Sequence, residues 1–358
     1  MIQTYFGENL IFIISQPRSG STLLQRVLSG HPEIQTSAET WLMLHPVYGL
    51  KETGIEAEFH AKWAATAVKE FLENYTDGLH VYDAAIRAWA KTIYGNALSK
   101  SDKRYFLDKT PRYFFIVPEL YRLFPKARFI FLIRNPMAVL DSLLKTYVKG
   151  RWPVLEFFKA DLLLAPRLIL EGIELLGDDA ITVRYEELVE NPDGVVSQLC
   201  DKLGIPYFRE MLEYSRTAAP VGKLNDHAGI HQHDRPHSES VNKWMRMNED
   251  AQECHFALSY VDGLGRDVVE RLGYSFDDTK EALSRRSCIG GGRHLFPWGL
   301  AMRSRSEWSL GERIMADRYF AVTEQGPWAG NLGLVKRLFK RLLGGVGVWR
   351  RGVDLPKR

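Results

Sequence analysis

Residues 10–27 read LIFIISQPRSGSTLLQRV, and this stretch decides the fold. The apolar run 10–14 is typical of a buried β-strand, and the residues from Ser21 onward have the pattern of a helix. Between them lies a turn with glycine and hydroxyl residues. A helix that starts directly after a strand presents free backbone N–H groups and the positive end of its dipole, which both attract phosphate. The stretch therefore predicts a phosphate-binding loop.

The first 205 residues alternate between short strand-like segments and longer helical ones. This alternation predicts an α/β protein with a P-loop-like three-layer fold, whose central, mostly parallel sheet of about five strands is flanked by helices. Ligands of such a sheet bind at the carboxyl ends of its strands. The expected strands are 10–15, 34–37, 104–107, 128–133 and 180–184, and the expected helices are about 21–30, 60–99 (as two helices), 113–124, 136–148, 154–176 and 193–203.

The pattern is less regular after residue 205. A histidine-rich loop is followed by a helical stretch at 247–272, and we expect a domain at 1–275 and a C-terminal extension at 276–358. Near 332–344 the extension has leucines on one helical face and lysines and arginines on the other. Such a helix either packs on the protein itself or lies on an anionic membrane surface, and both readings stay open.

Composition limits the kind of protein. The net charge is +3, and 334–358 holds the basic excess, which argues against a body that binds nucleic acid. The three cysteines are far apart and predict neither a disulfide framework nor a metal site. With no basic leader and no apolar stretch of membrane-spanning length, we expect a cytoplasmic protein, peripheral on the inner face of the membrane if its tail contacts lipid.

The opening loop lacks the lysine of a Walker A loop, which would stand at Ser21. Arg18 supplies positive charge instead, and Gly20 permits close backbone approach. Ser19, Ser21 and Thr22 add hydroxyl donors. The loop therefore suits one phosphate with a short anionic extension, although an ordinary capped helix remains open.

A second motif is RFIFLIRNPMAVLDSLL at 128–144. Asn135 can cap the helix after the strand, and Pro136 suits its first turn. Arg134 is thereby expected at the edge of the sheet, with Ser142 further along the helix. The pattern predicts a second anion-binding element.

Taken together, the two motifs resemble the sulfotransferase family that uses 3′-phosphoadenosine 5′-phosphosulfate (PAPS), and most of all the bacterial type related to the tyrosylprotein sulfotransferases. QPRSGST resembles the family's loop for the 5′-phosphosulfate. LIRNPMAVLDS resembles its 3′-phosphate element, in which Arg134 and Ser142 would grip the phosphate. The resemblance covers about 10–245 and implies PAPS as donor and 3′-phosphoadenosine 5′-phosphate (PAP) as product.

The resemblance also implies catalytic residues. Within HPEIQTSAETWLM, Glu39 would act as the general base. Within YFLDKTPRY, Lys109 would neutralise the oxygen that bridges phosphorus and sulfur, helped by Arg18. Arg112 is a second candidate cation. From the residues alone, Glu39 could equally be a solvated or helix-capping acid, and Lys109 part of a surface ion pair.

Further contacts to the nucleotide are implied downstream. Tyr185, in VRYEELVENP, would approach the adenine, although a core position is as well supported. In SVNKW, Lys243 would contact phosphate while Trp244 packs beneath it. The family's serine near the sulfonate has no clear counterpart, and either Ser238 or Ser240 could substitute for it.

These residues predict transfer of the sulfonate group from PAPS to a hydroxyl of an unidentified acceptor, a small-molecule, lipid or polyketide-like compound. Several large apolar residues before Lys109 would line an apolar acceptor pocket or lie in the core: Trp41, Leu42, Met43, Leu44, Trp63 and Trp89. No metal site is expected, because the spacing of His227, 231, 233 and 237 matches no ligand pattern. A P-loop kinase or NTPase and a non-catalytic nucleotide-binding protein are the alternatives.

Overall fold

The computed structural model describes residues 5–55, 57–149, 155, 157–213, 236 and 238–284. The chain divides into two compact units, one made of Met1–Thr146 with Ala160–Gly292 and the other of Tyr147–Lys159 with Arg293–Arg358. The sheet and the helices that cover it belong to the first unit. The expected basic helix near 332–344 and the four histidines lie outside the described residues.

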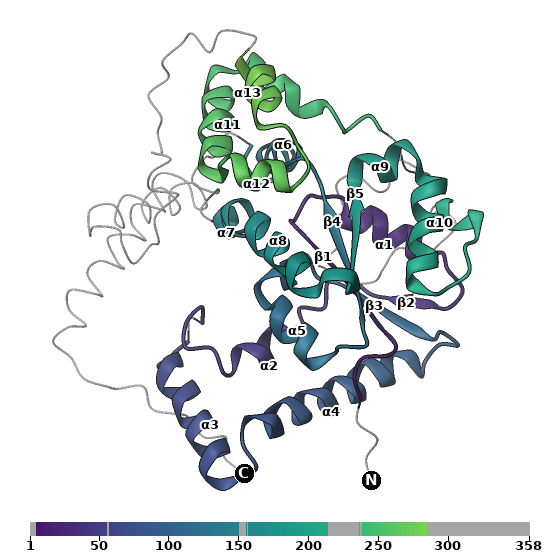
Figure 1. Ribbon diagram of the computed structural model, residues 1–358, viewed down its shortest axis with the longest axis vertical. Coiled ribbons are helices and arrows are strands. Elements are labelled where there is room, and N and C mark those ends of the chain that lie inside the picture. The colour runs from purple at the N-terminus through teal and green to yellow at the C-terminus, as the bar shows by residue number, and fades with distance from the viewer. Residues whose placement is uncertain are drawn as a thin grey trace, which may run out of the picture. The chain divides into compact units, whose positions relative to one another are not determined.

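The centre of the first unit is a sheet of five parallel strands (Figure 1). The strands lie in the order β2-β3-β1-β4-β5, and Ile13 of β1 is the register partner of Lys109 on β3. The expected α/β fold is confirmed, and the sheet is wholly parallel in the described residues. The strands are β1 Leu10–Ser15, β2 Ile34–Thr36, β3 Tyr105–Lys109, β4 Arg128–Ile133 and β5 Ala180–Arg184.

Helices and short helical turns connect the strands and follow them. They are α1 Ser21–Ser29, α2 Leu44–Tyr48, α3 Ala61–Tyr75, α4 Leu79–Leu98, η1 Pro111–Ile116, α5 Val117–Leu123, α6 Pro136–Leu143, η2 Leu144–Val148, α7 Lys159–Leu163, α8 Ala165–Leu176, η4 Gly177–Asp179, α9 Tyr185–Glu190, α10 Pro192–Leu203, η5 Arg209–Leu212, η8 Lys243–Glu249, α11 Ala251–Leu264, α12 Arg266–Arg271 and α13 Phe276–Ser284.

Successive strand residues point into two separate cores. Ile11 and Ile13 of β1 pack with α1, α9 and α10, whereas Leu10 and Phe12 pack with α4, α5 and α8. Because side chains alternate along a strand, an unbroken apolar run serves both faces at once. The result is a three-layer arrangement, as expected from the sequence (Figure 1).

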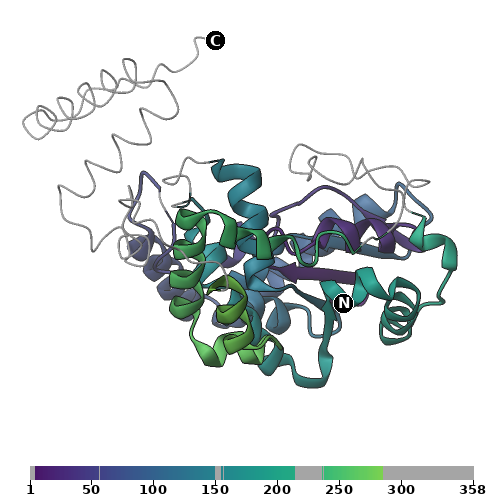
Figure 2. The same ribbon diagram turned by 90° about the horizontal axis from the view of Figure 1, so that it is seen from above.

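The helices after residue 250 cover one end of the sheet. Figure 2 shows α11, α12 and α13, in green, at the end toward which β1 points. Val268 of α12 and Leu272, the residue after that helix, form a small buried cluster with Ile133, the last residue of β4, and Leu170 of α8. This end carries the carboxyl termini of all five strands, where a ligand is expected.

The structure departs from the sequence reading at a few places. The expected helix 154–176 is interrupted between α7 and α8, where Pro166 lies in the first turn of α8. Helices α9 and α13 were not expected at all. Cys254 is disulfide-bonded, which the cysteine spacing did not indicate, while Cys200 is a buried free thiol. Among the described residues, no helix is both long and apolar enough to cross a membrane.

Candidate active site

The loop between β1 and α1 has an unusual backbone. Arg18 and Gly20 adopt positive φ angles of 73° and 89°. A Cβ atom at Gly20 would lie 2.4 Å from the ring of Tyr185, so a side chain there would collide with the first residue of α9. Gly20 is therefore required both by its backbone angle and by the close approach of Tyr185.

Gly20→Ala is expected to destabilise the protein, because it displaces Tyr185 as well as straining the backbone. Gly204→Ala is the matched control, since Gly204 has a φ of 68° but nothing within 4 Å of its Cβ position. The control should cost only about 1–2 kcal/mol, the usual penalty for a left-handed non-glycine residue. Urea unfolding of both variants checks this, and equal losses of unfolding free energy in both would contradict the role of Tyr185.

Arg134 joins three segments at the end of β4. Its Nη1 donates to the carbonyl oxygen of Arg18 at 2.8 Å, and its Nη2 donates to the carbonyl oxygen of Ser240 at 3.1 Å. Its guanidinium lies over the ring of Tyr185, 4.2 Å from the ring centroid. Arg18 in turn donates from Nε to Ser142 Oγ on α6 at 3.1 Å. Arg18, Arg134 and Ser142 thus converge, as a shared ligand would require.

Two donors at this point are buried and have no hydrogen-bond partner within the described residues: Ser19 Oγ and Arg134 Nε. Burial lowers the pKa of Arg134, and the positive charge of Arg18 lowers it further. Unpaired buried donors and neighbouring like charges are both costly. An anion bound here would remove both costs. We define Arg18, Ser19, Arg134 and Ser142 as the arginine cluster.

A second group of polar side chains lies at the other end of the same loop. Lys109, the last residue of β3, donates to Glu39 Oε1 at 2.9 Å and to Thr22 Oγ1 at 3.4 Å. The Lys109 side chain is only 1% exposed and that of Glu39 is 22% exposed. Trp41 Nε1 donates to the second oxygen, Glu39 Oε2, at 3.1 Å. Lys109 is therefore not part of a surface ion pair, and Glu39 does not cap a helix.

Arg112 is engaged by a buried acid that the sequence did not single out. It donates to both oxygens of Asp161, from Nε at 2.9 Å and from Nη2 at 2.5 Å. The guanidinium also lies over the ring of Trp41, 5.3 Å from its centroid. Burial raises the pKa of Asp161, and the hydrogen bonds from Arg112 oppose this. Arg112 thus holds Trp41 in place beside Glu39.

Helix α1 also holds the segment that leads to Glu39. Gln25 Nε2 donates to Thr36 Oγ1 and to the carbonyl oxygen of Ser37, both at 2.7 Å. The sequence analysis did not identify Gln25, because a glutamine on a helix gives no sign that it will make a tertiary contact. The phosphate-binding loop and the Glu39 segment are thereby connected through one helix.

The segment 238–244 lies against the arginine cluster. Ser240 Oγ is 2.5 Å from the hydroxyl of Tyr185, and the Ser240 carbonyl accepts from Arg134. Trp244 is buried, whereas Lys243 and Ser238 are exposed. Tyr185 is 6% exposed and packs in the core that includes α1. Its ring is thus already in contact with Gly20 and Arg134.

Some of the apolar residues expected in a pocket or in the core are buried, and others are exposed. Met43 is fully buried, and Trp41 lies beside Glu39. Trp63 on α3 is 74% exposed and Trp89 on α4 is 38% exposed, so both lie on the surface. Neither of these two tryptophans lies in the core, and a place for them in an acceptor pocket stays a prediction. Across the described ranges, no group of three or more histidine, cysteine or acidic side chains could hold a metal ion.

Most of the residues described above lie within a segment that is similar to known proteins. Residues 10–210, more than half of the chain, match the profile of the sulfotransferase family. The chain belongs to the sulfotransferase family. The match spans β1 to η5 and thus includes both arginines of the arginine cluster, as well as Glu39 and Lys109.

Two curated relatives illustrate the range of this family. Nodulation protein NoeE of Sinorhizobium fredii is 34% identical over 218 residues, which cover 54% of this chain and 50% of that protein. A putative protein-tyrosine sulfotransferase of Caenorhabditis briggsae is 26% identical over 226 residues, which cover 61% and 74% of the two chains. The chain thus spans about half the length of NoeE.

Among solved structures, the sulfotransferase domain from the curacin biosynthetic pathway aligns with a TM-score of 0.48 at 25% identity, covering 67% of this chain and 91% of that one. The sulfotransferase domain from the Synechococcus PCC 7002 olefin synthase aligns with a TM-score of 0.45 at 27% identity, covering 68% and 90%.

Proposed function

We propose that this sulfotransferase moves the sulfonate group of PAPS to a hydroxyl group of an acceptor. The observation that carries the proposal is the pair of unpartnered buried donors, Ser19 Oγ and Arg134 Nε, in the arginine cluster. One loop connects this cluster to the Lys109–Glu39 pair through Thr22. PAPS has a phosphate at one end of its ribose and a phosphosulfate at the other, which suits two sites joined in this way.

The loop residues would hold the 5′-phosphosulfate. The backbone around Gly20 and the start of α1 offer N–H groups, and Ser19, Ser21 and Thr22 add hydroxyls. Arg134 and Ser142 would hold the 3′-phosphate. Arg18 would serve this phosphate too, since its side chain donates to Ser142. Arg18 would contribute less than Lys109 to neutralising the charge that develops on the leaving group.

Two further residues would complete the nucleotide site. Tyr185 would support the nucleotide, because its ring lies between Gly20 and Arg134 and its hydroxyl is hydrogen-bonded to Ser240 Oγ. An edge contact with the adenine is compatible with this position. Lys243, which is exposed on η8, would reach a phosphate from the segment 238–244, which lies against the arginine cluster.

The transfer step would use the Lys109–Glu39 pair. The acceptor oxygen attacks sulfur while its proton passes to Glu39, and the bond between sulfur and the bridging oxygen breaks. PAP leaves with the new charge on its 5′-phosphate, which Lys109 meets. Lys109 Nζ lies 2.9 Å from Glu39 Oε1 and neutralises that carboxylate. When the donor binds, Lys109 would turn to the bridging oxygen and leave Glu39 free to accept the proton.

The acceptor is proposed to be a small-molecule, lipid or polyketide-like hydroxyl compound. Trp41 supports an apolar group next to the reacting hydroxyl, since its indole nitrogen donates to Glu39. Labelled sulfate from PAPS should appear in one class of compound after incubation with an extract of the host cell. Tight PAP binding without any labelled product would favour a non-catalytic nucleotide-binding protein, and magnesium-dependent ATP hydrolysis would favour a kinase or NTPase.

Arg134→Ala is expected to weaken PAP binding about 10- to 100-fold, because each hydrogen bond to a charged group contributes about 1.5–3 kcal/mol. Binding of AMP, which lacks the 3′-phosphate, should change little. Titration calorimetry with both nucleotides checks this. Arg167→Ala is the control, since Arg167 on α8 also donates to backbone carbonyls, of Gly263 and Leu264. Equal losses for PAP and AMP would contradict the assignment of Arg134 to the 3′-phosphate.

A further inference from the structure

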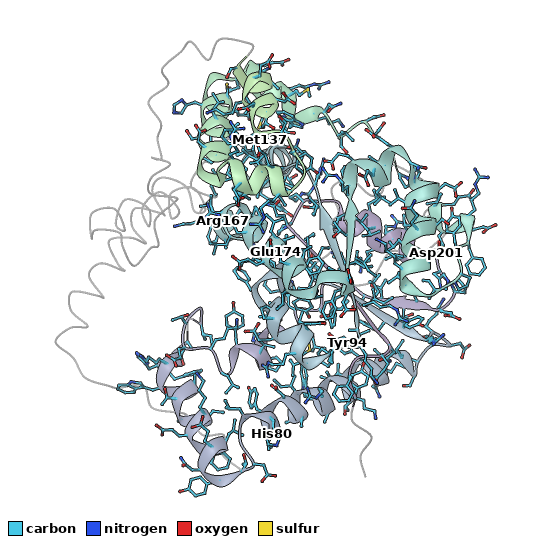
Figure 3. The ribbon with its side chains drawn as sticks, in the orientation of Figure 1. His80, Tyr94, Met137, Arg167, Glu174 and Asp201 are labelled. Carbon is cyan, nitrogen blue, oxygen red and sulfur yellow. The ribbon has the colours of Figure 1, made fainter. Side chains whose placement is uncertain are left out.

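Asp108, the residue before Lys109 on β3, is a carboxylate buried to 1% exposure. Three hydroxyl groups donate to its Oδ2: Thr40 at 2.6 Å, Tyr94 at 2.7 Å and Tyr113 at 2.9 Å. Thr110 donates to its Oδ1 at 2.9 Å. Tyr94 reaches it from α4, and Figure 3 labels Tyr94 between that helix and the strands. A buried charge is tolerated only when it is hydrogen-bonded in this way.

Asp108 and Lys109 point into different layers. Phe106, two residues before Asp108, packs with α4 and η1, and Leu107, two residues before Lys109, packs with α1. The alternation of a strand therefore turns Asp108 away from the phosphate-binding loop and Lys109 toward it. Asp108 cannot take part in the transfer directly.

The hydroxyls around Asp108 hold the segment that follows Glu39. Trp41 N donates to Thr110 Oγ1 at 3.3 Å, Leu42 N to Thr40 Oγ1 at 3.1 Å and Met43 N to the Tyr113 hydroxyl at 3.1 Å. Each of the three accepting hydroxyls donates its own proton to Asp108. Three successive backbone N–H groups are thus fixed by one carboxylate through one layer of hydroxyls.

This segment needs such support. Trp41 has a φ of 52°, in the left-handed region that non-glycine residues avoid. A conformation of this kind persists only where its surroundings determine it. The same residue donates from its indole nitrogen to Glu39 Oε2. The turn at Trp41 therefore decides where the Glu39 carboxylate lies relative to Lys109.

We propose that Asp108 is a positioning residue for the transfer reaction: acting through Thr40, Thr110 and Tyr113, it fixes the turn 40–43 and so holds Glu39 against Lys109. This inference rests on the proposed role of Glu39. Burial raises the pKa of Asp108, and the four hydroxyl donors oppose that rise. The hydroxyls thereby keep the buried group as an acceptor for all of them.

Thr40→Val and Tyr94→Phe form the test, because each removes one hydroxyl from the same oxygen, Asp108 Oδ2. Thr40 belongs to the turn beside Glu39, and its hydroxyl accepts from Leu42 N. Tyr94 lies on α4, and its hydroxyl contacts Asp108 and the Tyr113 hydroxyl. Thr40→Val is expected to lower kcat about 10- to 100-fold with little change in the KM for PAPS. Tyr94→Phe should lose comparable stability in urea but keep kcat within about threefold, as expected for a change outside the catalytic geometry.

Two further variants separate positioning from folding. Thr40→Ser keeps the hydroxyl and should restore most of kcat. In a Glu39→Gln background, Thr40→Val should have almost no additional effect on kcat, because both changes act on the same group. The proposal is overturned if Thr40→Val and Tyr94→Phe lower kcat equally, or if the two losses at Thr40 and Glu39 multiply.

The outcome for Glu39 itself is read separately. If Glu39→Gln retains full transfer, the proposed general base is wrong. If Glu39→Gln loses transfer while Thr40→Val keeps it, the base stands and only the positioning role of Asp108 fails.

Discussion

Glu39→Gln should lower kcat for sulfonate transfer by about 10²- to 10⁴-fold, the range found when a general base is removed. PAP affinity should stay the same, because Glu39 lies with Lys109 and Trp41 and outside the arginine cluster. Glutamine is chosen because its amide oxygen can still accept from Lys109. The folded structure should therefore survive the change, and single-turnover assays with labelled PAPS measure the chemical step.

Glu33→Gln is the control for this variant. Glu33 precedes β2 in the same connection. Its backbone hydrogen-bonds to Arg104, Tyr105 and His31, and its carboxylate interacts electrostatically with His31. Its replacement should leave transfer within about twofold, the range of surface substitutions away from a site. A Glu39→Gln protein as active as the Glu33→Gln protein would remove Glu39 from the mechanism.

Lys109→Met should lower kcat by about 10²- to 10³-fold, the cost of losing one donor at a developing negative charge. Methionine keeps the length and apolar character of the buried stem. The variant also leaves Glu39 without its cation partner, so part of any loss could come from a disturbed fold. Near-normal binding of PAP and a cooperative urea transition would show that the loss lies in the transfer step.

A double variant, Lys109→Met with Glu39→Gln, separates these two effects. Removing both partners leaves no unpaired charge at this partly buried position, so unfolding free energy should recover relative to Lys109→Met alone. Transfer should not recover. If the double variant regained activity together with stability, Lys109 would be a structural cation and its proposed contact with the leaving group would be wrong.

The fold could largely be predicted from the sequence, because the strands are short apolar runs of β-branched and aromatic residues bounded by polar ones. β1, β4 and β5 begin and end where those runs do. Helices α9 and α13 could not be predicted in the same way. Their own sequences give no clear periodic pattern, and each packs on the sheet or on α11.

The candidate site was predictable where a residue ends a strand. Arg134 and Lys109 stand at such ends, and the parallel sheet brings them to one edge. Asp108 and Asp161 were not found, because a single acid gives no sign that it is buried among hydroxyls or paired with an arginine. The core alternative for Trp63 and Trp89 was wrong, since a large apolar side chain on a helix can lie on the surface.

The two consecutive side chains at the end of β3 have opposite signs and opposite directions. Deleting one residue earlier in that strand would exchange them, because the pleat repeats every two residues. The ammonium would then be trapped among hydroxyls that need an acceptor, and the carboxylate would face the bound anion and repel it. The length of this strand thus sets the polarity of the site, so chain-length changes tolerated elsewhere would here invert its charge.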